Sequence, residues 1–546
     1  MGKKLNLQWV SDVIGNDYKK WRKGDVVSIK AQTGTGKTWF IKNKLIPYME
    51  DWESMLIVVN RTNLKRQLKI DLFNYYNQPI PDNLDDARKI GNVTILSYQK
   101  ISEMKNGKDY GLKEFNIDHF DYIVCDECHF FLSDSGFNNK TDLAFEALIR
   151  ERHRNVVKIF ISATMDEIEK AIENGFNNSL EEWFGTGKNK YWPSKLYDTG
   201  IDYSYVDCKY FKSINDVTTL IKNDKSEDKW LVFVTKKSDA NDIKERLEGI
   251  HKCEIITKDT KTKDSEDLQS IINESKFKSK VLICTKAMDN GINIEDETVK
   301  NIVIMAYDKV TFIQELGRVR QDIENAYDIN LYIPTFSWSS FNTLINIKYE
   351  PKKDDIKLFE EDYNKFCNKY DRNLDKLHKD IFYRHKDGSY KINPNGYCRL
   401  IKDDLFAKEM LENYKVFDKY AYVLKQLEWL DLTDTFSVDK LIEDVVDDEE
   451  VCNLEQYLSN LFDNKVVMLQ AKDRTELIKN IGLIDGHNSN IKKDKIKYIK
   501  NIETLNAHLK GLKSSYRIKE FETSRISGGK KKNYKNAWKI EKTISY

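Results

Sequence analysis

One short segment near the amino terminus limits the possible folds more than any other feature of the chain. Residues 31–38 read AQTGTGKT and lie between an apolar run of strand length, 25–31, and a segment of helical spacing, 37–49. Gly34 and Gly36 allow backbone N–H groups to close around phosphate oxygens, which is the chemistry of a phosphate-binding loop. A chance match in a lysine-rich chain is the alternative, and the strand–loop–helix context argues against it.

The polar residues of this loop have separate expected roles. Lys37 would reach the β- and γ-phosphates of ATP, and the hydroxyl of Thr38 would bind Mg²⁺. The usual first glycine of such loops is replaced here by Ala31. The other positions expected to contact the nucleotide are Thr33, Gly34, Thr35 and Gly36.

Strand-like and helix-like segments alternate through the first part of the chain. Apolar runs of strand length lie at 55–60, 92–96, 122–125 and 156–161, and again at 230–234, 281–284 and 301–306. Short apolar strands separated by helices are typical of a doubly wound parallel sheet. We therefore expect two α/β domains, at 1–194 and 195–345.

An acidic motif follows the third of these runs directly. The sequence DECH places Asp126 and Glu127 at the carboxyl end of an expected parallel strand, the edge that faces the phosphate site. Asp126 can hold Mg²⁺, and Glu127 can orient and deprotonate the attacking water. An isolated acidic pair is more often a helix cap or a solvated turn. Its position after the phosphate-binding loop favours the catalytic interpretation.

Three further patterns follow in order. SAT, at 162–164, closes the next strand, and TKAMDNG, at 285–291, follows a strand of the second domain. QELGRVR, at 314–320, begins or crosses a helix. Its arginines, Arg318 and Arg320, either form a pair on a helix surface or reach across a cleft to the γ-phosphate.

Taken in order, A-x-T-G-x-G-K-T, DECH, SAT, T-x-x-x-D-x-G and Q-x-x-G-R resemble the motifs of superfamily 2 DExH helicases over roughly residues 25–325. The resemblance implies two RecA-like domains with ATP in the cleft between them. It also implies that Gln314 and Arg318 complete the ATP site from the second domain. The family's second arginine would fall at Gln321, so Arg320 is the nearest replacement.

The same resemblance gives roles to other residues. His129, Ser162 and Thr164 would couple the state of the nucleotide to domain movement, and Asp289 and Gly291 would contact the nucleotide. Hydroxyl, amide and arginine side chains at strand ends suit contacts to the phosphates of a nucleic acid. The expected nucleic-acid contacts are Asn60, Arg61, Thr62, Ser97, Tyr98, Gln99, Thr235 and Thr285.

The carboxyl-terminal part has a different pattern. Charged amphipathic helices predict a helical accessory region at 346–455. A basic domain, 456–546, follows, and residues 491–546 hold sixteen Lys and Arg against five Asp and Glu. Helices followed by a Gly-broken basic loop between two strand-like runs suggest a winged helix, weakly similar to modules of phage and mobile-element replication helicases. Tyr534 and Trp538 are candidates for base stacking, with a solvated basic surface and a core tryptophan as the alternative.

Composition excludes several classes of protein. Charged residues make up 32% of the chain but nearly cancel at net +1, so any nucleic-acid surface must be local. The eight cysteines are scattered, and the C-x-x-C pair Cys125 and Cys128 lacks a second pair at zinc-site spacing. No signal peptide and no apolar run of about 18 residues is evident. We expect a cytoplasmic protein with no membrane partner.

The sequence therefore predicts an ATP- and Mg²⁺-dependent helicase or translocase acting on single-stranded or branched nucleic acid, DNA more than RNA. The first alternative is a nucleic-acid-stimulated ATPase that senses or remodels without strong unwinding, for example in phage defence. It is favoured because only 292–313 separates the last two motifs, which leaves little room for a strand-separating hairpin. The second is a non-enzymatic clamp, which intact Lys37 and Glu127 argue against. We find no metal-nuclease motif, and protein partners cannot be predicted.

Overall fold

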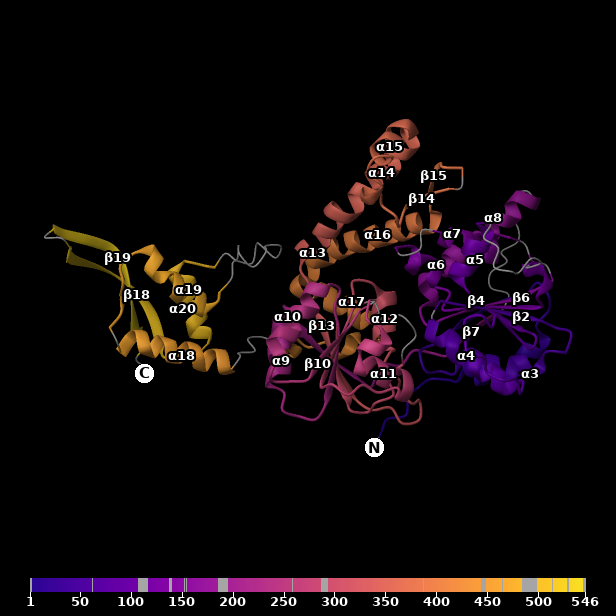
Figure 1. Cartoon of the computed structure of the whole chain (residues 1–546), viewed down its shortest axis with the longest axis horizontal. Helices are drawn as coiled ribbons and strands as arrows, with labels where there is room; N and C mark the ends of the chain where they lie inside the picture. Colours follow the sequence, from indigo (N-terminus) through magenta and orange to yellow (C-terminus); the bar gives the residue numbers. More distant parts are fainter. Residues whose placement is uncertain are drawn as a thin grey trace. The chain divides into compact units, whose positions relative to one another are not determined.

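The computed structural model describes residues 2–60, 62–106, 116–136, 140–151, 153, 155–184, 195–257, 259–285, 293–385, 387–442, 448–463, 465–483, 498–512, 514–527 and 530–543. The chain divides into two compact units, one of Met1–Ser213 with Ser226–Leu441 and one of Ile214–Lys225 with Ile442–Tyr546. The first unit holds two parallel-sheet domains and a helical region (Figure 1). No helix among the described residues is long and apolar enough to cross a membrane.

The first domain is built on a seven-stranded sheet. Its strands are β1 (Val26–Lys30), β2 (Met55–Val59), β3 (Lys89–Ile90), β4 (Val93–Ser97), β5 (Tyr122–Asp126), β6 (Val157–Ser162) and β7 (Lys195–Asp198). They lie in the order β3-β4-β2-β5-β6-β1-β7, parallel except that β3 runs antiparallel to β4. β7 extends this domain past the boundary expected at residue 194.

Helices cover both faces of this sheet (Figure 1). Alternate residues of a strand point to opposite faces, so Ile57 of β2 joins one apolar cluster and Leu56 the other. Phe40 and Phe130 belong to the helices that close these two clusters. The helices are α1 (Val10–Ile14), α2 (Lys37–Phe40), α3 (Ile46–Tyr48), α4 (Thr62–Tyr75), α5 (Tyr98–Lys105), α6 (Phe130–Ser133), α7 (Thr141–Phe145) and α8 (Glu169–Phe184).

The strand order brings the sequence motifs together. Parallel strands end at one edge of the sheet, and β6 lies between β1 and β5. The loop after β1 holds the AQTGTGKT segment, β5 ends at Asp126 and β6 ends at Ser162. Three expected functional segments therefore meet at the carboxyl edge of adjacent strands.

A second seven-stranded sheet confirms the expected second α/β domain. Its strands are β8 (Val206–Phe211), β9 (Lys229–Phe233), β10 (Cys253–Ile256), β11 (Val281–Cys284), β12 (Val299–Ile304), β13 (Ile329–Pro334) and β16 (Leu441–Ile442). Their order is β10-β11-β9-β12-β13-β8-β16, and the strand pairs from β10 through β8 are parallel. The helices of this domain are α10 (Lys237–Leu247), α11 (Glu266–Glu274) and α12 (Lys309–Leu316).

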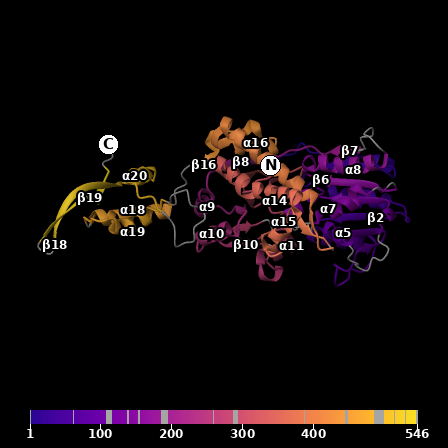
Figure 2. The same ribbon diagram turned by 90° about the horizontal axis from the view of Figure 1, so that it is seen from above.

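The helical region packs on both domains (Figure 2). It contains α13 (Trp338–Thr343), α14 (Glu350–Glu361), α15 (Tyr363–Tyr370), α16 (Pro394–Phe417), α17 (Ala421–Trp429) and a hairpin of β14 (Phe382–Arg384) and β15 (Tyr390–Ile392). The hydroxyl of Tyr422 in α17 donates to the carbonyl of Ala306, 2.6 Å away, in the second domain. α16 lies against α6 of the first domain, and the hydroxyl of its Tyr414 donates to the carbonyl of Thr335 in the second domain at 3.0 Å, so this one helix touches both halves of the unit.

The second unit contains α9 (Ile214–Asn223), α18 (Asp448–Asp463), β17 (Val467–Met468), α19 (Thr475–Ile481), α20 (Ile502–Gly511), β18 (Tyr516–Ser527) and β19 (Lys530–Lys542). The three strands form an antiparallel sheet in the order β17-β19-β18. Among the residues that the structure describes from α18 onward, the succession helix, strand, helix, helix, strand, strand in this sheet order resembles that of a winged helix. α18 spans the boundary expected at residue 455.

The structure corrects one expectation about this unit. Trp538 is only 3% exposed and lies in an apolar cluster with Leu458 and Leu505. Its ring is unavailable for stacking on a base, because it forms part of the core of the unit. Tyr534 is half-buried, with the ammonium of Lys532 5.5 Å from its ring centroid, and it remains a candidate.

Candidate functional site

The phosphate-binding loop has the backbone that its glycines predict. Gly34 has φ +94° and Gly36 has φ +80°, a left-handed region that side chains with a Cβ rarely adopt. A Cβ at Gly36 would also lie 3.2 Å from the ring of Trp9, closer than most Cβ contacts. Ala31, at the usual first-glycine position, is fully buried at the end of β1.

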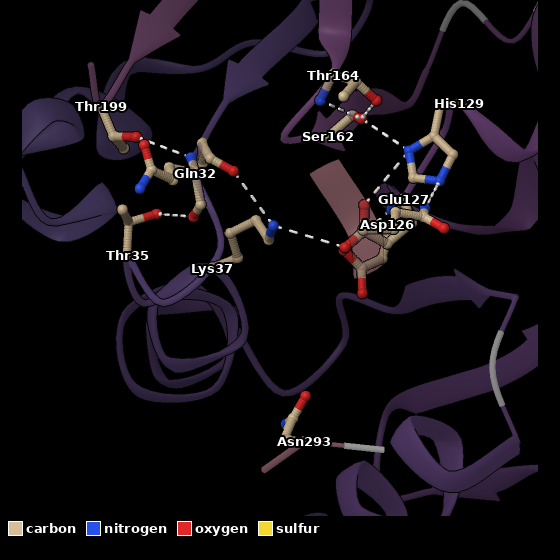
Figure 3. A network of polar contacts seen from close by, with 12 residues as sticks. Gln32, Thr35, Lys37, Asp126, Glu127, His129, Ser162, Thr164, Thr199 and Asn293 are labelled. Carbon is tan, nitrogen blue, oxygen red and sulfur yellow. Dashed lines mark hydrogen bonds and ion pairs between the residues drawn. The ribbon is translucent and has the colours of Figure 1, made fainter. Parts of the chain in front are cut away.

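Residues of the connection between the two domains hold the phosphate-binding loop in place. The sequence did not predict these contacts. The amide of Gln32 donates to the carbonyl of Asp202 and accepts from its N–H, both at 2.9 Å. The backbone N–H of Gln32 donates to the hydroxyl of Thr199 at 3.2 Å (Figure 3). Thr35 is buried, and its hydroxyl donates to the carbonyl of Gln32, so only its backbone can face a phosphate.

Lys37 and Glu127 point into the same space (Figure 3). The Lys37 ammonium donates to the carbonyl of Ala31 at 3.2 Å and lies 3.6 Å from Glu127 Oε1. The two side chains are 11% and 15% exposed. A partly buried ammonium beside a carboxylate at the open end of a glycine loop can bind a phosphate and position a water molecule.

Glu127 sits directly after the end of β5. Its φ is +49°, an uncommon value for a residue with a side chain, and one that places it at the turn between β5 and α6. Asp126 is 7% exposed, and its Oδ1 accepts from the Glu127 N–H at 3.1 Å. Tyr98 supports this turn by donating from its hydroxyl to the carbonyl of Asp126 at 2.9 Å.

Tyr98 therefore does not fit the role given to it by the sequence. Its side chain is 0% exposed and its ring stacks on Phe130, 4.5 Å between centroids. Burial raises the pKa of its hydroxyl well above the ordinary value. The expectation of a nucleic-acid contact through this side chain is wrong, because the ring lies in the core beneath the acidic motif.

His129 connects three groups. Its Nδ1 lies 2.9 Å from Ser162 Oγ and 3.4 Å from Glu127 Oε2. Its Nε2 contacts the amide of Gln314, which comes from α12 of the second domain. Ser162 Oγ in turn accepts from the Thr164 N–H at 3.0 Å (Figure 3). The acidic motif, the SAT segment and the second domain thus meet at one imidazole.

The QELGRVR segment leaves its helix earlier than expected. α12 ends at Leu316, and Val319 forms a parallel bridge with Ile294, so Arg318 and Arg320 follow the helix instead of lying on it. Arg318 is 2% exposed, and Arg320 Nη2 donates to Asn293 Oδ1 at 2.8 Å.

These residues form the wall of a cleft between the two domains. One part of the cleft is lined by Thr33, Glu127, Gln314, Arg318 and Arg320. The adjoining part is lined by loop residues and by the second domain, among them Gly34, Lys37, Thr38, Arg320 and Gln321. Gln321 accepts the N–H of Tyr327 through its side-chain oxygen, so it is used within its own domain. Asp289 and Gly291 lie outside the described residues.

The donors near the loop suit magnesium better than a transition metal. The described residues include no group of three or more His, Cys, Asp and Glu placed to hold a metal. Mg²⁺ instead takes one or two protein oxygens together with substrate phosphates, and Thr38 and Asp126 offer a hydroxyl and a carboxylate. Cys125 and Cys128 are fully buried, and burial raises the pKa of Cys125 to about 12, as expected of a core thiol and not of a zinc ligand.

The expected nucleic-acid contacts are only partly brought together. Asn60 and Gln99 lie at the ends of neighbouring strands, and the amide of Gln99 donates to Asn60 Oδ1 at 3.1 Å. Ser97 caps α5 by accepting from the Lys100 N–H. The remaining positions differ in location and exposure. Thr62 begins α4, Thr285 is half-buried and Thr235 is exposed, while Arg61 lies outside the described residues.

Comparison with known proteins gives matches to both domains. Residues 7–167 match the family model "Type III restriction enzyme, res subunit", and residues 212–321 match "Helicase conserved C-terminal domain". No curated protein matches the sequence of the chain.

Three solved structures illustrate the similarity in fold. Saccharomyces cerevisiae Dbp5 bound to RNA and ADP BeF3 is 18% identical, over 59% of this chain and 82% of that chain, with a TM-score of 0.40. A DEAD box protein from Methanococcus jannaschii is 18% identical, over 62% and 89%, with a TM-score of 0.34. The Escherichia coli DEAH/RHA helicase HrpB is 13% identical, over 60% and 42%, with a TM-score of 0.38.

The two family models match the chain in the order in which the two sheets occur, and the cleft between the sheets has a phosphate-binding loop and an acidic motif. The chain is an ATP-hydrolysing enzyme of the helicase type with two RecA-like domains. The two family-model matches support placement in superfamily 2 and activity on nucleic acid.

Proposed function

We propose that the chain is a DExH-type motor that couples ATP hydrolysis to movement along single-stranded nucleic acid. The observation that carries this proposal is the imidazole of His129. It touches Glu127, Ser162 and Gln314 at once. A change at the γ-phosphate that moves Glu127 would therefore displace both the SAT segment and the second domain.

The chemistry is divided among a few side chains of the first domain. Lys37 binds the β- and γ-phosphates, and Glu127 orients and deprotonates the attacking water. Thr38 and Asp126 would hold Mg²⁺, which would supply positive charge to neutralise the phosphates. Backbone N–H groups of residues 33–36 bind the remaining phosphate oxygens.

The second domain completes this site when the cleft is closed. Gln314 and Arg318 approach from the end of α12, and Arg320 lines both parts of the cleft. We assign the two arginines to the developing charge on the γ-phosphate, and Asp289 and Gly291 to nucleotide contacts. His129, Ser162 and Thr164 couple this closure to movement of the domains.

The strand would lie across the ends of the first sheet and continue onto the second. Asn60 and Gln99 form one contact patch, with Arg61, Thr62 and Ser97 beside them in sequence, and Thr235 and Thr285 supply the second domain's contacts. These groups suit phosphate contacts, so stepping does not depend on base sequence. We propose 3′-to-5′ movement from the motif resemblance, and DNA in preference to RNA.

A length series of single strands tests translocation. A motor that walks along a strand hydrolyses more ATP per binding event as the strand becomes longer, whereas a sensor saturates once its binding site is filled. The assay measures steady-state ATPase with single-stranded DNA of increasing length and with matched RNA, duplex and branched DNA. Hydrolysis that does not depend on strand length would overturn the proposal of translocation.

The basic hairpin of β18 and β19 is proposed as an additional nucleic-acid surface. Lys532 and Lys535 are exposed near its tip. Removing one lysine that binds a phosphate should reduce the slope of log affinity against log salt by about 0.7 to 0.9. Lys532→Ala with Lys535→Ala should therefore flatten the salt dependence, while exposed Lys19→Ala serves as control. Deleting 491–546 is a poorer test, because it removes α20, β18 and β19 and with them half of the core of the unit.

A remodelling ATPase without strong unwinding is the second candidate. Among the described residues 293–313, β12 leads through a short loop to α12, and no hairpin is inserted there. Strand displacement from 3′-tailed, 5′-tailed and flush duplexes separates the two functions. ATPase stimulation without displacement from any duplex would favour the remodeller.

A further inference from the structure

The short helical turn after SAT, η6 (Met165–Glu167), is tied to the nucleotide-sensing residues. The Glu167 N–H donates to the carbonyl of Thr164 at 3.1 Å. The Thr164 N–H donates to Ser162 Oγ, which lies 2.9 Å from His129. Glu167 therefore follows any movement of the SAT segment.

The accessory helix α16 holds this turn through Lys402. The Lys402 ammonium donates to the backbone carbonyl of Glu167 at 2.8 Å and lies 2.5 Å from its carboxylate. Two contacts to one residue, one of them to the backbone, fix the position of the turn more firmly than a side-chain pair alone. The Glu167 side chain is 23% exposed, so it is partly shielded from solvent.

One turn earlier on the same helix, Arg399 holds the second domain. Its Nη2 lies 3.4 Å from Asp308 Oδ2, and its Nε donates to Asp403 at 2.7 Å. The Arg399 side chain is 20% exposed, and both carboxylates raise its pKa against the effect of burial. Residues three positions apart share one face of a helix, so Arg399 and Lys402 point from α16 toward the two motor domains together.

Asp308 is the N-cap of α12. It accepts from the Thr311 N–H at 3.0 Å and from the Thr311 hydroxyl at 2.9 Å. α12 then carries Gln314 to His129. A cap at the start of a two-turn helix fixes the direction of the residues at its end.

These contacts close into a ring. From His129 it passes through Ser162, Thr164 and Glu167 to α16, and from α16 through Asp308 and α12 back to Gln314. Lys309 and Asp166 form a direct ion pair between the two domains inside the ring. The charged residues of the ring surround one cavity, lined among others by Asp166, Glu167, Asp308, Lys309, Arg399 and Lys402.

We propose that Arg399 and Lys402 make α16 a coupling strut, which holds the SAT turn and the start of α12 at the spacing that lets Gln314 reach His129. This proposal rests on the proposed nucleic-acid-dependent motor. Arg399 and Lys402 are positioning residues, since neither lines the nucleotide cleft. The helical region thereby sets how strongly nucleic acid accelerates hydrolysis, and the chemistry of the unstimulated site does not depend on it.

Lys402→Gln and Arg399→Gln remove the charge and keep most of the side chain. Each should leave the basal kcat and the KM for ATP unchanged and reduce the stimulation by saturating single-stranded DNA by about five- to tenfold. Lys408→Gln is the matched control, because Lys408 lies on the same helix and pairs with Asp404, inside the helical region, at 2.9 Å. It should be stimulated like the wild type.

A charge exchange separates coupling from a merely structural role. Lys402→Glu should lose stimulation, and adding Glu167→Lys should restore part of it, because the ion pair is re-formed in the opposite sense. Partial rescue together with unchanged thermal unfolding of Lys402→Gln supports the strut. Wild-type stimulation in both single Gln variants overturns it, and so does an equal loss of basal and stimulated rates. Failure of wild-type protein to respond to any nucleic acid would instead overturn the proposed motor function on which the strut rests.

Discussion

The two sheets contribute to the nucleotide cleft in different ways. The first supplies Lys37 from the loop after β1 and Glu127 and His129 from the turn after β5, already joined by contacts of 3.6 and 3.4 Å within one domain. The second supplies Gln314, Arg318 and Arg320 from the end of a single helix and the segment that follows it. The side chains of the first domain are thus in contact before the cleft closes. Those of the second domain can leave the cleft together, through one movement of that domain.

This difference separates nucleotide binding from hydrolysis. In the proposed mechanism, groups fixed in the first domain bind phosphates in an open cleft, whereas positive charge for the transition state comes from the opposite side. Preorganised charge of this kind acts most strongly where water is excluded. Substitutions in the two domains should therefore affect ATP binding and ATP turnover differently.

The largest expected effect comes from Arg318. Removing an arginine that stabilises the γ-phosphate costs about 10³- to 10⁵-fold in kcat in related phosphoryl-transfer enzymes. Arg318→Ala should nearly stop nucleic-acid-stimulated hydrolysis and retain most ATP binding, measured by steady-state phosphate release and by titration with a fluorescent ATP analogue.

Arg318 is 2% exposed, so the loss of its charge can also affect folding. Arg318→Lys keeps a buried cation while losing the planar guanidinium, and its thermal unfolding provides the control. Rapid hydrolysis by a folded Arg318→Ala protein would show that the second domain's charge comes from elsewhere.

Glu127→Gln tests the first domain in the same assays. A general base contributes roughly 10²- to 10⁴-fold, so turnover should fall by that order while ATP stays bound. The protein should then release nucleic acid more slowly, because the closed state persists, as measured by dissociation of a labelled strand. Turnover at the wild-type rate would mean that Glu127 is not the base.

Arg320 should have a smaller effect. On a continuous helix it would be rotated away from Arg318, but the chain is extended at Val319, and Arg320 lines the cleft with its guanidinium held by Asn293. Arg320→Ala should reduce stimulated kcat more than about tenfold, which corresponds to roughly 1.4 kcal/mol of barrier. Wild-type ATPase in this variant would leave the γ-phosphate to Arg318 alone.

The motifs that follow strands could be predicted from the sequence because their chemistry is local. Strand–loop–helix spacing predicted the place of Lys37 and Glu127. The apolar runs predicted the strands next to the motifs, but the sequence did not predict β3, β7, β8, β10, β13 and β16. The end of α12 could also have been found, since Gly317 directly follows the last helical residue, as glycines often do at helix ends.

Other features depend on residues far apart in the chain, and no local pattern reports them. Gln32 is hydrogen-bonded to Asp202, and Lys402 to Glu167. The partners in each pair are so far apart in the sequence that a single sequence does not indicate the pairing. Tyr98 directly follows β4, where the sequence predicts an exposed side chain. Its hydroxyl instead donates to the backbone carbonyl of Asp126 in the interior of the domain. The register of β18 against β19 shifts between Phe521 and Thr523, so strand alternation did not identify which aromatic residue is buried.

The smallest expected effect comes from Gly317→Ala, at a point where the two domains lie close together. A Cβ added there would lie 2.7 Å from Thr33 Oγ1 in the phosphate-binding loop, closer than real Cβ atoms come. The backbone of Gly317 is helical, with φ −68° and ψ −2°, so alanine is acceptable there by conformation. The closest obstacle to the added Cβ is Thr33, and the carbonyl of Ile313 lies 3.1 Å away. Gly317→Ala therefore tests how tightly the cleft must close.

Crowding of one methyl group in a packed contact costs roughly 1 kcal/mol, equivalent to about fivefold in an equilibrium or a rate. Because Thr33 belongs to the loop, Gly317→Ala should raise the KM for ATP and lower stimulated kcat by about that factor, with basal binding to single strands unchanged. Gly511→Ala is the control, since a Cβ at that position meets nothing within 4 Å. Adding Thr33→Ala removes Oγ1 and leaves Thr33 Cβ, 3.1 Å away, as the nearest atom of that residue, so it should recover part of the loss. If Gly317→Ala is as active as the wild type, the productive cleft is more open than the structure, and the second domain reaches the phosphate through its arginines alone.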